Sequence, residues 1–150
     1  MALTDSPEAP VAEGLSAIAC RIDPAATGTS NIERLSGGAT QEIWRFDIET
    51  PRGLSGRYIL RRAPGGTRIT DGVGLAVEAQ LMAAAARAGV PVAAVAHILT
   101  PEDGLGLGFV MRFVEGETLG GRIVKSDHLR AARQTLAFEC GETLARIHSI

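Results

Sequence analysis

Apolar residues recur at helical spacing near the start of the chain. The steps are three or four residues, which predicts an amphipathic helix over residues 9–22. The apolar positions are Val11, Leu15, Ile18 and Ile22. Asp23-Pro24 ends this helix, because the residue before a proline avoids helical dihedral angles. Residues 1–8 are predicted to be a disordered tail, and residues 24–30 a loop of small and polar residues.

Three strands are predicted next, with glycine-containing turns between them. The first is short, over 32–36, and glycines break it. The second, over 43–49, alternates with a period of two. Its residues Trp44, Phe46 and Ile48 point one way, and Arg45 and Asp47 point the other way. A turn over 50–56 precedes the third strand, over 57–62, and a Gly/Pro-containing loop follows it.

The second half of the pattern begins with a helix over 73–89, which Gly89 and Pro91 end. Its predicted apolar stripe is Val77, Leu81, Ala85 and Ala88. Two apolar strands, over 95–99 and 109–114, are joined by a turn at 101–104. After a connector over 116–121, a helix is predicted over 127–147. Its apolar stripe is Leu129, Ala132, Leu136, Cys140, Leu144 and Ile147.

The predicted order is therefore helix, three strands, helix, two strands and helix. Turns this short join antiparallel strands, so we expect an α+β fold with about five antiparallel strands and one helix packed on the sheet. A further helix precedes the sheet, and helical structure follows it.

Composition and charge argue against several classes of protein. The net charge is −2, Lys125 is the only lysine, and the arginines are scattered, so no nucleic-acid-binding surface is expected. No apolar run approaches the length of a membrane span, and no signal peptide is recognised, so we expect a cytoplasmic protein. Cys20 and Cys140 lack metal-ligand spacing; they could form one long-range disulfide but are predicted to be two buried thiols. The sequence contains no Walker motif and no Gly-x-Ser-x-Gly motif, which argues against a Walker-type NTPase and against a serine hydrolase.

Four pieces carry candidate chemistry. Backbone N–H groups and hydroxyls of the glycine turn at 36–40 could hold phosphate oxygens, although such turns are usually plain hairpins. Arg61 is a strand cation suited to a phosphate, or else a solvated edge residue. Glu78 is the only carboxylate of an apolar helix, so Arg61 is its natural partner, although it could be an ordinary surface residue. The apolar strand ending in Glu115-Gly116 could offer backbone groups to an adenine edge, or simply be buried.

In this order the pieces resemble the protein-kinase-like fold, and in particular the aminoglycoside phosphotransferase family. Five segments carry the resemblance, in register over about residues 10–150. They are LSGG (35–38), YILRRAP (58–64), VPV (90–92), FVMRFVEG (109–116) and LARIH (144–148). Their wording is most similar to the branch that also occurs fused to acyl-CoA dehydrogenases.

The resemblance implies a role for each matched residue in binding ATP. Ser36, Gly37, Gly38, Ala39 and Thr40 would form the loop over the phosphates. Arg61 would stand at the phosphate-binding cation, and Glu78 would orient it. Ile59 would line the adenine pocket. Met111, Arg112, Phe113 and Val114 would form the hinge segment that contacts adenine. Residues 9–116 would be the N-lobe, and 117–150 the start of a helical C-lobe.

The family's catalytic loop reads His-Gly-Asp, and none of the three histidines of this chain is followed by Gly-Asp. We therefore expect the chain to stop before the catalytic and Mg²⁺-binding residues of a small-molecule kinase, and to be inactive alone. Its last helix would then expose an apolar stripe and associate. A non-catalytic binding module with the same fold, or an unrelated α+β interaction domain, are the alternatives. The acceptor stays open among aminoglycosides, choline-like alcohols, sugars and hydroxyacyl compounds.

Overall fold

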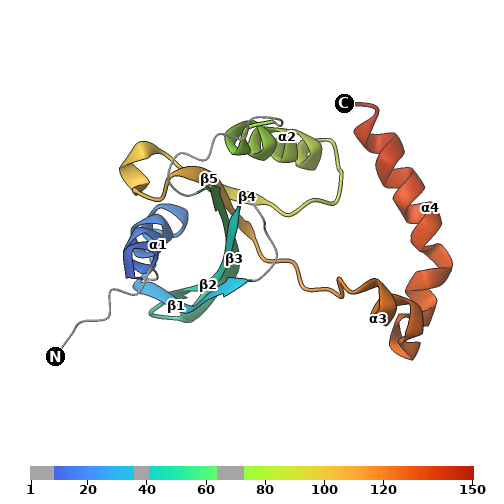
Figure 1. Ribbon diagram of the computed structural model, residues 1–150, viewed down its shortest axis with the longest axis horizontal. Helices are drawn as coiled ribbons and strands as arrows, with labels where there is room; N and C mark the ends of the chain where they lie inside the picture. Colours follow the sequence, from blue (N-terminus) through green and yellow to red (C-terminus); the bar gives the residue numbers. More distant parts are fainter. Residues whose placement is uncertain (1–8, 36–40, 64–72) are drawn as a thin grey trace.

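The computed structural model describes residues 9–35, 41–63 and 73–150 (Figure 1). The loop predicted to cover the phosphates, 36–40, lies outside the described residues, as does the tail at 1–8. The helices are α1 (Ala9–Ile22), α2 (Leu75–Arg87), α3 (Gly120–Lys125) and α4 (Arg130–Ile147). The strands are β1 (Gly28–Leu35), β2 (Glu42–Thr50), β3 (Gly53–Ala63), β4 (Val95–Ile98) and β5 (Leu107–Arg112). The described residues also form two 3₁₀ turns, η1 (Pro101–Asp103) and η2 (Asp127–Leu129).

The five strands form one sheet in the order β1-β2-β3-β5-β4. Every neighbouring pair is antiparallel, as the short turns predicted. The α+β fold, with one helix before the sheet and helices after it, is confirmed, and it is consistent with a kinase-like N-lobe.

One face of the sheet packs on α1 and forms the larger core (Figure 1). The predicted alternation of β2 is confirmed here, because Trp44, Phe46 and Ile48 all point into this core. Tyr58, Leu60 and Val110 join them from β3 and β5, and Leu15 and Ile18 are among the α1 residues that cover them. The predicted helix over 9–22 matches α1 at both ends.

The opposite face carries α2 and a smaller core, and we call it the α2 face. Leu75 and Ala79 pack there against Phe109 and Ala63. The predicted stripe of α2 was wrong, because Val77 and Leu81 are 47% and 59% exposed. Nearly every position of this alanine-rich helix is apolar, so the periodicity did not determine which side faces the sheet.

Several strand boundaries differ from the predictions. β1 begins at Gly28, inside the predicted loop, because Thr27 and Gly28 already pair with Glu49. β3 begins at Gly53, inside the predicted turn, so the β2–β3 hairpin is tighter than its glycines suggested. β5 runs from Leu107 to Arg112 and does not reach Val114.

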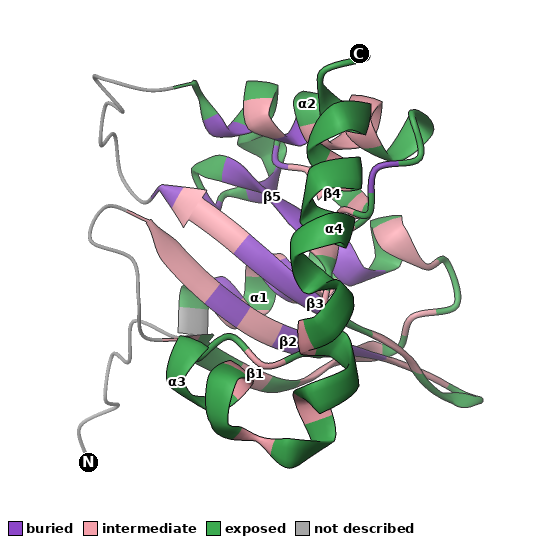
Figure 2. Cartoon of the chain, turned by 90° about the vertical axis from the view of Figure 1, so that its right-hand side faces the viewer, coloured by how far each residue is buried: buried purple, intermediate pink, exposed green. Residues whose placement is uncertain are grey.

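The C-terminal helices stand away from the sheet, and Figure 2 shows α4 mainly in the colour of exposed residues. The single helix predicted over 127–147 is η2 followed by α4, and α3 precedes it. Arg146 of α4 donates a hydrogen bond to the carbonyl oxygen of Gly89 (3.3 Å). The prediction of two buried thiols was wrong, since Cys20 and Cys140 are both exposed. Within the described ranges, no helix combines the length and apolar character that a membrane span requires.

Candidate functional site

Strand register brings three predicted site residues, Arg61, Ile59 and Met111, together on the α2 face. Arg61 of β3 stands between Ile43 of β2 and Phe109 of β5. Two residues along β3, Ile59 stands between Arg45 of β2 and Met111 of β5. These two rows lie side by side because residues two apart on a strand share a face. The site is therefore built on paired strands, with α2 beside it.

The Arg61 guanidinium makes a forked contact with the Glu78 carboxylate of α2. Nη1 lies 2.5 Å from Oε1, and Nη2 lies 3.4 Å from Oε2. The two side chains are 24% and 33% exposed, so the pair is neither fully buried nor freely solvated. The predicted partnership of Arg61 and Glu78 is confirmed. Glu78 reaches the sheet because it lies one turn after Leu75, on the same side of α2 as the buried residues.

Two more contacts hold the guanidinium in place. Nη2 of Arg61 also donates to the Gln41 side chain (2.9 Å), and its Cζ lies 5.4 Å from the centroid of the Phe109 ring. A guanidinium has five N–H donors, so it can keep these partners and still present a donor to an anion. Its neighbour Arg62 bonds to Glu42 (2.9 Å) and points to the other face, as predicted for adjacent strand residues.

The apolar part of the site lies beside this cation. Ile59 is 6% exposed, while Met111 is half-buried and packs against the α2 core. Ile43 lies in the row next to them. Aliphatic and thioether side chains of this kind form the surface on which a flat aromatic ring can rest.

The segment after β5 has its backbone partly engaged. The N–H of Arg112 donates to Ala94 (2.8 Å), and that of Phe113 donates to the carbonyl oxygen of Arg57 (2.9 Å). The Arg112 side chain stacks on Tyr58, with Cζ 4.7 Å from the ring centroid, and therefore belongs to the α1 face. Val114 is exposed. Any contact that Arg112 makes on the α2 face must involve its backbone.

Sequence reasoning missed two residues of this site. Gln41, the residue directly after the glycine turn, was given no role, and it bonds directly to Arg61. Ile43 was placed on a strand without a function, although its alternation with Trp44 already put it on the opposite face from the α1 core. Both signals were visible, but the strand register that joins them to Arg61 was not.

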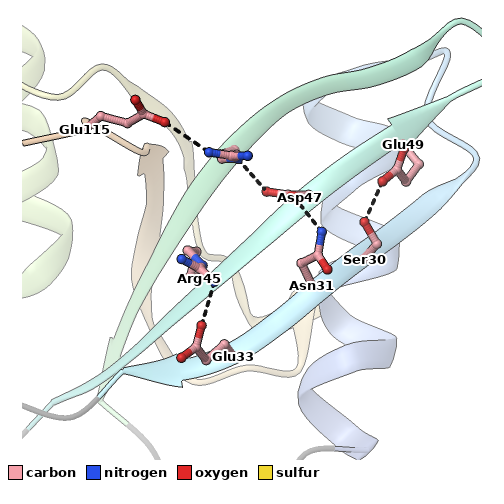
Figure 3. Close-up of polar contacts among 8 residues, drawn as sticks. Ser30, Asn31, Glu33, Arg45, Asp47, Glu49 and Glu115 are labelled. Atoms are coloured by element: carbon pink, nitrogen blue, oxygen red, sulfur yellow. Dashed lines mark hydrogen bonds and ion pairs between the residues drawn. The ribbon is translucent and has the colours of Figure 1, made fainter.

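A second polar network crosses the α2 face further along the same strands (Figure 3). Arg45 pairs with Glu33 (2.7 Å) at the outer strands. Arg57 lies between Asp47 and Glu115, with contacts of 3.7 and 3.0 Å. None of these residues was predicted to interact.

Asp103-Gly104, which resembles a metal-binding Asp-x-Gly only superficially, has a structural role. The buried Asp103 carboxylate contacts Arg21 of α1 and lies 2.9 Å from Nε2 of His97. It also accepts a hydrogen bond from the backbone N–H of Thr100 (2.7 Å), in a capping box of η1. This side chain lies among α1, β4 and η1, away from Arg61.

Comparison with known proteins adds the family. The model of the phosphotransferase enzyme family (APH) matches residues 31–150. No curated protein and no solved structure matches the chain. The matched residues include all five strands except the first residues of β1, both partners of the Arg61–Glu78 pair, and α4. Membership of such a family indicates a phosphotransferase-type function, and the chain belongs to the phosphotransferase enzyme family.

Proposed function

We propose that these 150 residues form the nucleotide-binding part of an ATP-dependent phosphotransferase that acts on a hydroxyl group of a small molecule. The observation that carries this proposal is the Arg61–Glu78 pair next to an apolar surface on the α2 face. In phosphotransferases of the kinase type, a strand cation oriented by a helix glutamate holds the phosphates of the nucleotide.

The side chains on the α2 face match the chemical groups of a nucleotide. Arg61 would contact the phosphates, because it is held by Glu78 and Gln41 and retains donors for an anion. Ile59 and Met111 would lie against the adenine, since they are apolar and one row away from the cation. The backbone of 112–114 would offer hydrogen bonds to the edge of the base. Residues 36–40 would complete the phosphate site.

The described residues do not form a binding site for the metal ion of phosphoryl transfer. In the ranges that the structure describes, no group of three His, Cys, Asp or Glu side chains is placed to hold a cation. The sequence contains no His-Gly-Asp either. We therefore propose nucleotide binding, and no transfer step, for these residues.

Titration of the full chain with ATP tests the proposal. We expect weak binding that Arg61→Ala reduces by roughly tenfold or more, since a hydrogen bond to a charged group is worth about 1.5–3 kcal/mol. Arg52→Ala is the matched control, because Arg52 is an exposed arginine of the β2–β3 turn and its loss changes the net charge equally. Isothermal titration calorimetry measures both.

The alternative is a binding module whose ligand is not a nucleotide. Wild-type chain that binds no ATP, or Arg61→Ala chain that binds it as well as wild type does, would favour that alternative over the proposal.

A further inference from the structure

Arg57 of β3 joins the segment after β5 to the sheet by two separate contacts. Its carbonyl oxygen accepts the N–H of Phe113 (2.9 Å). Its Nη1 lies 3.0 Å from Oε1 of Glu115 (Figure 3). Residues 113–119 form neither helix nor strand, so they lack the repeated hydrogen bonds that would fix their direction. Among the described residues, the hydrogen bonds from 113–115 to the sheet are both made to Arg57.

The other end of the Arg57 side chain is held by a buried carboxylate. Nε lies 3.7 Å from Oδ1 of Asp47, which is only 5% exposed. Oδ2 of Asp47 accepts a hydrogen bond from the Asn31 side chain (2.9 Å). Asn31 is the extra residue of a bulge in β1 and has a positive φ of 50°. The guanidinium is thus fixed on the sheet side and leaves Nη1 to Glu115, which is 78% exposed.

We infer that the Arg57–Glu115 pair is a positioning device that orients the backbone of residues 112–114 for contact with the nucleotide base. The inference depends on the proposed function, because it assigns a role to the same site. Backbone donors and acceptors bind a base more tightly when their direction is fixed before binding, because less ordering then has to occur on binding. Arg61 contacts the phosphates from a different row of the sheet, so the pair affects base recognition and leaves phosphate binding alone.

The test compares two ligands on the full chain. ATP carries both base and phosphates, whereas inorganic triphosphate carries only the phosphates. We expect Glu115→Ala to weaken ATP binding by roughly two- to fivefold, the range of an exposed ion pair, and to leave triphosphate binding unchanged. The exposed Glu115 side chain can be removed without uncovering the core, so this variant folds.

Glu33→Ala is the matched control. Glu33 is also an exposed glutamate paired with an arginine on the α2 face, at 2.7 Å from Arg45. It lies on β1, at the edge of the sheet, and among the described residues its ion pair is with Arg45 of β2 and not with the segment after β5. We expect its removal to change neither ligand's affinity.

Amide hydrogen exchange on the unliganded chain provides a second reading. Glu115→Ala is expected to speed exchange within residues 113–118 by several fold and to leave β3 and β5 unchanged, because only the local restraint is lost. Arg57→Lys keeps the charge but loses the forked reach between the two carboxylates, and we expect a smaller effect of the same kind.

The outcomes separate the two proposals. Wild-type chain that binds no ATP contradicts the proposed function, and the inference falls with it. Wild-type chain that binds ATP, with Glu115→Ala unchanged in affinity and exchange, contradicts the inference alone. Equal losses of ATP and triphosphate affinity also contradict it, because the pair would then act on the whole site.

Discussion

At the scale of single residues, Asp103 connects one end of the sheet to α1 through its contacts. Its side chain is fully buried, yet it is ionised among Arg21, His97 and the Thr100 backbone. A buried carboxylate is tolerated only when such partners replace its water shell. The turn that looked like a plain hairpin connection is therefore the anchor point of three elements: α1, β4 and η1.

Removing this charge should destabilise the fold. We expect Asp103→Asn to lower the free energy of unfolding by about 3 kcal/mol, because the neutral amide loses the charge that Arg21 contacts and keeps one acceptor oxygen in place of two. Urea denaturation measures the change. Glu102→Gln, an exposed change in the same turn, is the control and should have little effect. An Asp103→Asn chain as stable as wild type would show that the network is not stabilising.

The same residue makes stability depend on pH. Burial by itself would raise the pKa of Asp103, but hydrogen bonds from Thr100 and His97 and the charges of His97 and Arg21 outweigh it and lower the pKa below the ordinary 3.8. The stabilisation is therefore complete above pH 3.8 and is lost as pH falls through the lower folded-state value. Urea midpoints measured below pH 3.8 should fall more steeply for wild type than for Asp103→Asn.

Residue-level prediction from sequence worked where a charge stood out from its surroundings. Glu78 was the one carboxylate of an apolar helix, and its partner Arg61 followed from that. Alternation also placed Asp47 on the side away from the main core, where the structure has it, but gave no sign that the residue is buried there. Asn31, at the bulge in β1, donates a hydrogen bond to this carboxylate, and a single extra residue leaves no trace in a periodic pattern.

At the scale of elements, the contact between β3 and β5 leaves no room for a side chain at Gly108. A Cβ there would stand 2.2 Å from the carbonyl oxygen of Arg61, which is backbone and cannot rotate away. The strands could pair in this register only with glycine at the position. Gly108 stands directly before the FVMRFVEG segment, and the structure gives the reason for a glycine there: the close approach of the strands beside the candidate phosphate-binding residue.

Gly108→Ala is therefore expected to force β3 and β5 apart at Arg61. We predict a loss of about 1–3 kcal/mol in unfolding free energy and weaker ATP binding, since overpacking displaces the backbone. Chemical denaturation and calorimetry give the two values. Gly116→Ala serves as the control, because nothing lies within 4 Å of a Cβ at that position. Unchanged stability in Gly108→Ala would mean that the strands adjust without cost.

The helices show why element existence was easier to predict than orientation. α1 was predicted at both ends, because Pro24 limits it and its apolar residues are well spaced among polar ones. α2 was predicted as a helix, but the wrong side was predicted to face the sheet. Leu75 and Ala79 face it in place of Val77 and Leu81. In a helix so rich in alanine, the partner surface around Phe109 determines the buried side.

At the scale of the whole molecule, α4 presents an uncovered apolar surface. A hollow along it is lined by Leu136, Cys140, Leu144 and Ile147, together with Glu139 and Thr143. The predicted stripe therefore exists, and three of its large side chains are about half exposed. Apolar surface of this kind favours self-association in water.

We expect the chain to associate with increasing concentration, and the double variant Leu136→Gln/Leu144→Gln to shift it toward monomer. Sedimentation velocity over a concentration series measures the distribution. Ala137→Gln, an exposed change elsewhere on α4, should associate as wild type does. Identical distributions for wild type and the double variant would contradict an association through this stripe.

The whole-molecule view also places α1 within the folding unit. The family match begins at residue 31, yet Leu15 and Ile18 of α1 cover Trp44, Phe46 and Tyr58. The core on this face is built from both sides, so the structural unit extends to α1.

The bulge in β1 has a consequence for how this strand can change over evolutionary time. Ser30 pairs with Asp47 and Glu33 pairs with Arg45. Between these pairs β1 has two residues and β2 has one. Deleting Asn31 would leave Thr29, Ile32 and Arg34 on the sheet sides they now occupy. Deletion elsewhere in β1 would turn part of the strand over. Among homologous sequences, a one-residue gap in this strand should therefore fall at Asn31, and sequences with that gap should lack the carboxylate of Asp47 that Asn31 satisfies.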